Sequence, residues 1–231
     1  MANGRAAERG RLTARPLNAG TSVSEPGLRA LRLDEARDGV VYLPDRAGSG
    51  PMPLIVMLHG AGGDAAGMVE LLRGQADAEG IALLFPDSRA ATWDVIRGDY
   101  GPDVDFIDKA LAKLFAEQPI DPDRIALAGF SDGASYALSL GVMNGDLFSH
   151  ILAFSPGFIV PLSTVGEPEI YISHGVEDQV LPIRSCSRRI VPRLEEAGYS
   201  VLYREFPDGH VVPPDIVREA TDFFLGRMTG D

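Results

Sequence analysis

The residue best suited to nucleophilic chemistry is Ser131, the middle residue of the pentapeptide G-F-S-D-G at 129–133. The pentapeptide follows the apolar run 125–128 and precedes the small-residue stretch 134–140, so a strand, a sharp turn and a helix are expected in that order. Side chains at the two glycine positions would crowd a serine on such a turn. The pattern predicts a nucleophile elbow, in which the hydroxyl of Ser131 attacks a carbonyl carbon.

A serine hydroxyl is a weak nucleophile at neutral pH, so Ser131 requires a base and an acid that orients the base. His210 is the expected base, because it stands in the polar sequence D-G-H-V-V-P-P between the last expected strand and the last expected helix. Asp178, in H-G-V-E-D-Q-V, is the expected acid, because it follows a strand that ends at the same sheet edge. Glu177 remains the alternative, since only one of two adjacent side chains can reach the imidazole.

A tetrahedral intermediate also requires N–H donors for its negative oxygen. We expect these donors to be the backbone amides of Asp132 and of Ala61, the latter in the glycine-rich turn H-G-A-G-G. This turn has neither the Lys-Ser/Thr of a phosphate-binding P-loop nor the spacing of a dinucleotide fingerprint. The histidines His59 and His174 end strands and are expected to be structural.

Composition limits the classes of partner. The chain of 231 residues has 21 Lys and Arg against 33 Asp and Glu, which gives a net charge of −12. Such a charge repels nucleic acids and anionic lipids, and it favours a small-molecule substrate, although it also serves solubility. The sequence predicts no nucleic-acid partner and leaves both a monomer and a homodimer open.

Cys186 is the only cysteine, which excludes an intrachain disulfide and a multi-cysteine metal site. We expect no metal and no organic cofactor, and we expect Cys186 to be a small core residue. No run approaches the roughly 20 apolar residues of a membrane span, and the arginine-rich start lacks the apolar core of a secretion signal. A cytoplasmic location is therefore expected.

Strand-like apolar runs alternate with helical patterns from about residue 38, which is typical of a parallel sheet covered by helices. Strands are expected at 39–43, 53–58, 81–85, 125–128, 151–154, 170–173 and 201–206. Helical spacing of apolar residues predicts helices at 104–115, at 183–194 and from about 214, where Pro192 should kink the second helix or shift its start. Residues 1–26 lack periodicity and are expected to form a flexible arm, and residues 27–231 a single catalytic domain.

The segments L-H-G-A-G-G, G-F-S-D-G-A-S, S-H-G-V-E-D-Q-V-L-P and D-G-H resemble the α/β-hydrolase superfamily. Within it, the chain is similar to the phospholipase/carboxylesterase and dienelactone-hydrolase-like group of small esterases. The resemblance implies an α/β fold with helices on both faces of a mostly parallel sheet. It also implies a serine carboxylesterase that works through an acyl-enzyme, with Ser131, Asp178 and His210 catalytic and Ala61 and Asp132 as oxyanion donors. The chain departs from many relatives in one respect, because its residue after the serine is acidic rather than neutral.

About 15 residues separate Phe154 from Ile170, where larger relatives carry a helical lid, so we expect no large cap and an open cleft. Trp93, Tyr100 and Phe158 are the expected substrate-binding residues of this cleft, although Trp93 fits a packing role equally well. Arg89 and Arg97 flank Trp93 and suggest binding of an acidic portion of the substrate. A lysophospholipase-type lipid esterase and a peptidase or amide hydrolase are the alternative enzymes, and a non-catalytic binding protein is disfavoured.

Overall fold

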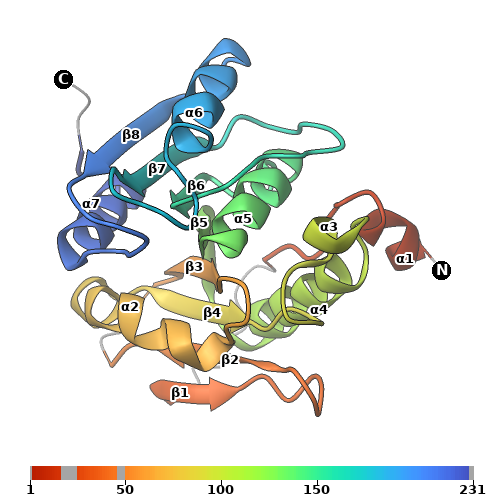
Figure 1. The fold of residues 1–231 in the computed structure, drawn as a ribbon. Coiled ribbons are helices and arrows are strands. Elements are labelled where there is room, and N and C mark those ends of the chain that lie inside the picture. The colour runs from red at the N-terminus through yellow and green to blue at the C-terminus, as the bar shows by residue number, and fades with distance from the viewer. Residues whose placement is uncertain (1, 17–24, 46–49, 229–231) are drawn as a thin grey trace.

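The computed structural model describes residues 2–16, 25–45 and 50–228, which form a central sheet with helices on both faces (Figure 1). Within this part of the chain the sheet has eight strands in the order β1-β2-β4-β3-β5-β6-β7-β8. The strands are β1 (Gly27–Ala30), β2 (Gly39–Leu43), β3 (Met52–Leu58), β4 (Ala82–Pro86), β5 (Ile120–Phe130), β6 (His150–Phe154), β7 (Glu169–Gly175) and β8 (Val201–Phe206). The pairs β1–β2 and β2–β4 are antiparallel, and the other neighbouring strands are parallel.

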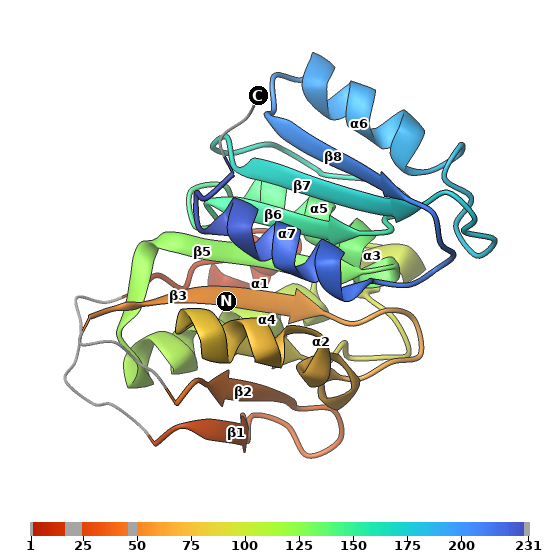
Figure 2. The ribbon, with the colours of Figure 1, turned by 90° about the vertical axis from the view of Figure 1, so that its left-hand side faces the viewer.

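Helices cover both faces of this sheet, and Figure 2 shows α2 and α7 together on one of them. The helices are α1 (Ala2–Ala7), α2 (Ala65–Glu79), α3 (Asp94–Arg97), α4 (Pro102–Glu117), α5 (Asp132–Met143), α6 (Ser187–Glu196) and α7 (Pro214–Phe224). Alternate residues of β3 enter opposite cores, because successive strand side chains point to opposite faces. Leu54 and Val56 belong to the core that also contains side chains of α4, α5 and α6, whereas Ile55 and Met57 belong to the core that also contains side chains of α2 and α7. A strand buried on both sides therefore has to be apolar at every position, as β3 is.

The predicted architecture is confirmed, and each of the seven expected strands is present. Residues 155–168 contain no helix and no strand, in agreement with the expected absence of a large cap. Strand β1 was not predicted, because it has only four residues and exposes alternate positions, including Leu28 at 50%. Among the described residues, no helix is both long enough and apolar enough to cross a membrane.

The helix that contains Pro192 begins later than its apolar pattern predicts. The predicted helical pattern begins at Ile183, but α6 begins at Ser187 and contains Pro192 as an interior residue. A proline has no N–H to donate to the carbonyl four residues earlier, so the helix lacks one hydrogen bond there. Cys186 lies at the N-cap of α6 and is buried, as expected for a core residue.

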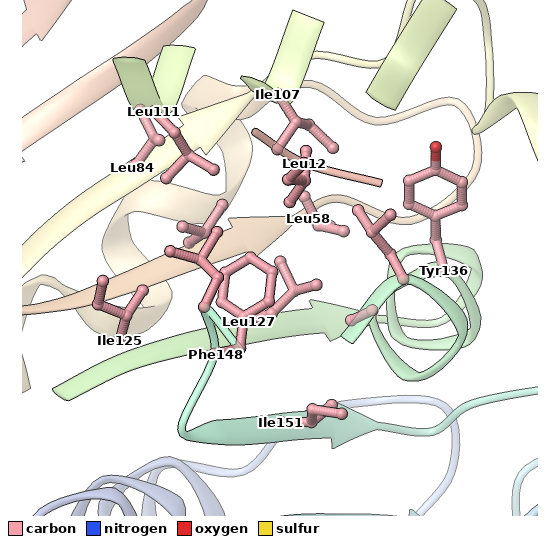
Figure 3. Packing of buried hydrophobic residues seen from close by; sticks show 14 of the residues in the cluster. Leu12, Leu58, Leu84, Ile107, Leu111, Ile125, Leu127, Tyr136, Phe148 and Ile151 are labelled. Carbon is pink, nitrogen blue, oxygen red and sulfur yellow. The ribbon is translucent and has the colours of Figure 1, made fainter. Parts of the chain in front are cut away.

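The N-terminal residues differ from the expected flexible arm. The side chain of Leu12 is 2% exposed and belongs to the same hydrophobic cluster as Ile107 and Leu58 (Figure 3). The backbone N–H of Leu12 donates to Asn144 Oδ1 at 2.9 Å, and Asn144 Nδ2 donates to the carbonyl of Gly10 at 2.8 Å. Residues 5–16 are thus packed against the rest of the protein, with Ala7, Leu12 and Ala14 in its core, whereas 17–24 lie outside the described residues. Composition did not reveal this, because the segment supplies only a few apolar side chains to a core that α4 and α5 build.

This packing predicts a large effect of Leu12→Ala on stability. We expect the free energy of unfolding to fall by about 2–4 kcal/mol, because the substitution leaves a cavity in a well-packed core. Urea denaturation of Leu12→Ala and of Leu28→Ala, a matched change at the exposed position in β1, measures the difference. A free arm at residues 5–16 would instead give two variants that are both as stable as the parent.

Candidate active site

Ser131 lies on a strained turn between β5 and α5. Its backbone angles are φ 58° and ψ −120°, a conformation that non-glycine residues rarely adopt. Its N–H donates to the carbonyl of Phe154 at 2.9 Å, which ties the turn to the end of the neighbouring strand β6. A Cβ on Gly129 would clash with the backbone of Gly133, and one on Gly133 would clash with the carbonyl of Leu58. The expected elbow is therefore present, and both of its glycines are required sterically.

The structure brings His210 to Ser131. His210 lies in the loop between β8 and α7, and its Nε2 is 2.9 Å from Ser131 Oγ. Its Nδ1 is 2.6 Å from Asp178 Oδ2, and its ring packs against that of Phe130 at 4.7 Å between centroids. The loop approaches β7 so closely that a Cβ on Gly175 would clash with the carbonyl of Gly209. The imidazole can therefore accept the proton of Ser131 while it donates to Asp178.

Asp178, rather than Glu177, is the carboxylate that reaches His210. The side chain of Asp178 is buried, whereas Glu177 is exposed. Burial acts to raise the pKa of Asp178, but the hydrogen bond from His210 and those from the N–H groups of Leu181 and Val180 outweigh it and hold the pKa below its ordinary value. Asp178 is consequently ionised at neutral pH and can stabilise a positive charge on the imidazole.

The H-G-A-G-G turn lies beside Ser131, since a Cβ on Gly60 would be 3.3 Å from Ser131 Cβ. Two amides of this turn are already used, because Gly62 N–H donates to Ala91 O at 2.7 Å and Gly63 N–H donates to Gly60 O at 3.1 Å. Among the hydrogen bonds of the described residues, none uses the N–H of Ala61 or of Asp132. These two amides are free to bind an oxyanion at this position.

Comparison with known proteins agrees with this geometry. Residues 104–225, about half of the chain, match the model of the family described as Phospholipase/Carboxylesterase. The chain belongs to this family.

Individual relatives are esterases by name. The chain is 34% identical to "Putative esterase NocK" of Nocardia uniformis subsp. tsuyamanensis over 69% of its own length and 48% of that protein. It is 27% identical to "Probable feruloyl esterase C" of Aspergillus clavatus over 63% of its own length and 56% of that protein. It thus spans about half the length of the curated relatives it matches. The crystal structure of esterase PE8 has the same fold, with a TM-score of 0.68, 24% identity, and coverage of 82% of this chain and 98% of PE8.

Trp93 lies in the interior of the protein and is not accessible to a substrate. Its side chain is fully buried, its Nε1 donates to the carbonyl of His59 at 2.9 Å, and its ring stacks on Tyr136 at 5.1 Å between centroids. The expected substrate contact is therefore wrong for Trp93, and its alternative packing role is the one observed. An indole ring with its N–H satisfied is well suited to the interior.

Tyr100 and Phe158 contact the N-terminal part of α5, Tyr100 through the ring of Tyr136 and Phe158 through Ser135. Tyr100 is almost buried, donates its hydroxyl to the carbonyl of Val160 at 3.0 Å and lines a surface pocket of about 650 Å³. Phe158 is half-buried, and its N–H donates to Ser135 Oγ at 3.4 Å. No contact joins either side chain to Ser131 among the described hydrogen bonds, so their role in substrate binding stays a prediction.

Arg89 is already engaged within the protein. Its guanidinium forms an ion pair with Asp34 at 3.0 Å, donates to the carbonyl of Asp87 at 2.8 Å and lies over the ring of Phe106. These contacts leave it poorly placed to bind an acidic substrate. Arg97, by contrast, is exposed.

Asp132, the acidic residue after Ser131, has a structural partner. Asp132 Oδ2 accepts a hydrogen bond from Thr92 Oγ1 at 2.7 Å, which ties the segment after β4 to the first turn of α5. A carboxylate at a helix N-terminus is also favoured by the helix dipole. The side chain of Asp132 therefore positions the segment that precedes Trp93, a role that the sequence analysis left open.

A row of serines on α5, not predicted from the sequence, contacts the segment between β6 and β7. Ser135 Oγ accepts from the N–H of Gly157 at 2.8 Å, and Ser139 Oγ accepts from the N–H of Val160 at 3.0 Å. These hydroxyls hold the segment between β6 and β7 against α5. The row could have been predicted from the spacing of Ser131, Ser135 and Ser139, because residues four apart lie on one face of a helix.

His59 is placed as a structural residue. Its Nε2 accepts from the N–H of Ser88 at 3.0 Å, so Nδ1 carries the proton and donates to the carbonyl of Gly60 at 2.7 Å. Burial lowers the pKa of His59, which keeps the imidazole neutral. In the described part of the chain, no group of three or more His, Cys, Asp and Glu side chains is arranged to hold a metal ion.

Proposed function

We propose that this chain is a serine carboxylic ester hydrolase that acts through an acyl-enzyme. The observation that supports this most strongly is the position of His210, which is hydrogen-bonded to Ser131 Oγ at 2.9 Å and to Asp178 Oδ2 at 2.6 Å. The strained backbone of Ser131 and membership of the phospholipase/carboxylesterase family add independent support.

In the first half of the reaction, Ser131 Oγ attacks the ester carbonyl carbon while His210 Nε2 takes the hydroxyl proton. The carbonyl oxygen becomes an oxyanion, which accepts hydrogen bonds from the amides of Ala61 and Asp132. The ester C–O bond then breaks, and His210 returns the proton to the leaving alkoxide. Asp178 stabilises the imidazolium throughout, and the products are a free alcohol and an acyl group esterified to Ser131.

In the second half, a water molecule replaces the alcohol. His210 takes a proton from this water as its oxygen attacks the acyl carbon, and the same two amides bind the second oxyanion. Collapse of the intermediate breaks the bond to Ser131 Oγ, which regains its proton from His210. The carboxylic acid leaves, and the chain's side chains return to their starting protonation states.

The absence of a helix or strand in residues 155–168 supports small or medium esters as substrates, because no large cap covers the nucleophile. A lysophospholipid esterase is the second candidate, because the family description includes phospholipases. Rates on a short acyl p-nitrophenyl ester, a lysophospholipid and an anilide matched to the ester would separate these candidates from an amide hydrolase. We expect the short ester to be cleaved fastest.

A fluorophosphonate probe tests whether Ser131 is activated. We expect the probe to label one residue, Ser131, and ester hydrolysis to fall in proportion to the labelled fraction, because only a serine paired with a base is nucleophilic enough to react. Peptide mass mapping locates the label, and protein unfolded in urea, in which the three side chains separate, serves as the control. A site that stays unlabelled, or a label on another residue, would contradict the proposal.

A further inference from the structure

A second buried histidine, His174, lies beneath the acid of the site. It is the next-to-last residue of β7, and its side chain is fully buried. Its Nε2 is 2.7 Å from the carbonyl oxygen of Leu181 and 3.2 Å from Asp178 Oδ2. Its Nδ1 is 2.6 Å from Ser187 Oγ, on the first residue of α6. Neither the elbow nor the oxyanion site uses this histidine.

The partners of His174 determine where its proton lies. A carbonyl oxygen can only accept, so Nε2 carries the hydrogen and donates to Leu181. Burial lowers the pKa of His174, which keeps the ring neutral and leaves Nδ1 without a proton. Ser187, which is fully buried, must then donate its hydroxyl proton to Nδ1. Hydrogen bonds at both ring nitrogens therefore hold His174 in the tautomer that carries its proton on Nε2.

This imidazole completes the surroundings of the Asp178 carboxylate. Asp178 Oδ1 accepts the N–H groups of Val180 and Leu181, each at 2.8 Å, and Oδ2 accepts His210 Nδ1–H at 2.6 Å. The Nε2–H group of His174 places a partial positive charge close to Oδ2, because Nε2 is 3.2 Å from that oxygen. Its hydrogen bond to the Leu181 carbonyl also holds the turn whose amides bind Oδ1.

We propose that His174 is a positioning residue: its neutral, Nε2-protonated imidazole, held by Ser187, aims the carboxylate of Asp178 at His210. The inference rests on the proposed function, since it assigns His174 to the same reaction. Ionisable groups near His174 are Asp178 and His210 at the site and Glu205 on β8, which is paired with Arg188 at 2.7 Å. Because Arg188 already balances Glu205, Asp178 is the carboxylate on which the N–H of His174 acts.

Two substitutions separate positioning from packing. His174→Gln keeps an N–H donor near the place of Nε2, whereas the shorter amide of His174→Asn reaches only about as far as Nδ1. We expect His174→Asn to lower kcat for a short ester about 100-fold, the loss typical of a small misplacement of reacting groups, with little change in KM. His174→Gln should recover about tenfold of this loss.

The acidic side of the pH profile gives a readout that packing alone does not move. A carboxylate held less firmly stabilises the imidazolium of the base less, so in His174→Asn the pH of half-maximal kcat/KM should move lower. His150→Gln is the matched control. His150 is a half-buried histidine at the start of β6, where it packs edge-on against Phe223 and Phe224. We expect His150→Gln to be less stable in urea denaturation and to leave the pH of half-maximal kcat/KM unchanged.

Three results would overturn the proposal for His174: a kcat of His174→Asn within twofold of the parent, no recovery in His174→Gln, or a pH profile that does not move. Ser131→Ala, assayed in parallel, separates this failure from failure of the proposed function. If Ser131→Ala is inactive and the His174 variants behave like the parent, only the role of His174 is wrong. If Ser131→Ala is active, the proposed function itself fails.

Discussion

Ser131→Ala is expected to abolish ester hydrolysis, with a fall in kcat of about 10⁶-fold. The substitution removes the nucleophilic oxygen, and the oxyanion amides that remain give only a small acceleration over water. Alanine tolerates the strained turn about as well as serine, so the variant should fold. Steady-state hydrolysis of a p-nitrophenyl ester of a short acid, together with circular dichroism, measures both effects.

Ser155 offers a matched control for this substitution. It is the other serine of the described residues with a positive φ, at 52°, and it is fully buried at the end of β6. Its hydroxyl has no hydrogen-bond partner, so it is not paired with a base. Ser155→Ala should keep kcat within about twofold of the parent. Residual activity of Ser131→Ala near the parental value would reject Ser131 as the nucleophile.

Asp178→Asn is expected to lower kcat about 10⁴-fold. The orientation of the new amide is determined by its surroundings, because the N–H groups of Val180 and Leu181 require an acceptor at Oδ1. The NH₂ group must then face His210 Nδ1, which has to give up its proton and accept. The proton of His210 moves to Nε2, where it faces Ser131, and the imidazole can no longer act as the base.

Glu177→Gln is the matched control for the neighbouring carboxylate. Glu177 is exposed, so this variant should keep kcat within about twofold of the parent. A larger loss in Glu177→Gln than in Asp178→Asn would transfer the role of the acid to Glu177. The assay is the same short-ester hydrolysis at neutral pH, with KM measured for each variant.

The Asp178 variant should also change the acid stability of the fold. The pKa of Asp178 is lower in the folded chain than its ordinary value of 3.8. At pH values between the two, the folded state therefore binds fewer protons than the unfolded state. The stability that this carboxylate contributes is therefore present above its ordinary pKa and is lost as the pH falls through the folded value. Asp178→Asn cannot lose this contribution, so its stability should depend less on pH in that range.

Much of the scaffold could be predicted from the sequence. Strands buried on both faces, such as β3, must be apolar at every position, and this composition is visible in the chain itself. The elbow is equally local, because Gly129 and Gly133 are imposed by clashes within a few residues and with one adjacent strand. Ser131, Asp178 and His210 each follow one of the parallel strands β5, β7 and β8, whose carboxyl ends share one edge of the sheet.

Tertiary structure alone decided the contacts that join distant segments. The sequence favoured Asp178 but left Glu177 as the alternative, and the choice depends on which side chain the turn after β7 directs inward. Trp93 is buried because Tyr136 and the His59 carbonyl meet there, and Leu12 is buried because Asn144 holds its backbone. The sequence by itself determined the strands, the elbow and the types of reacting groups, since short-range sterics and burial require them. Side-chain direction and pairing were decided by packing between elements far apart in the chain, which no single segment encodes.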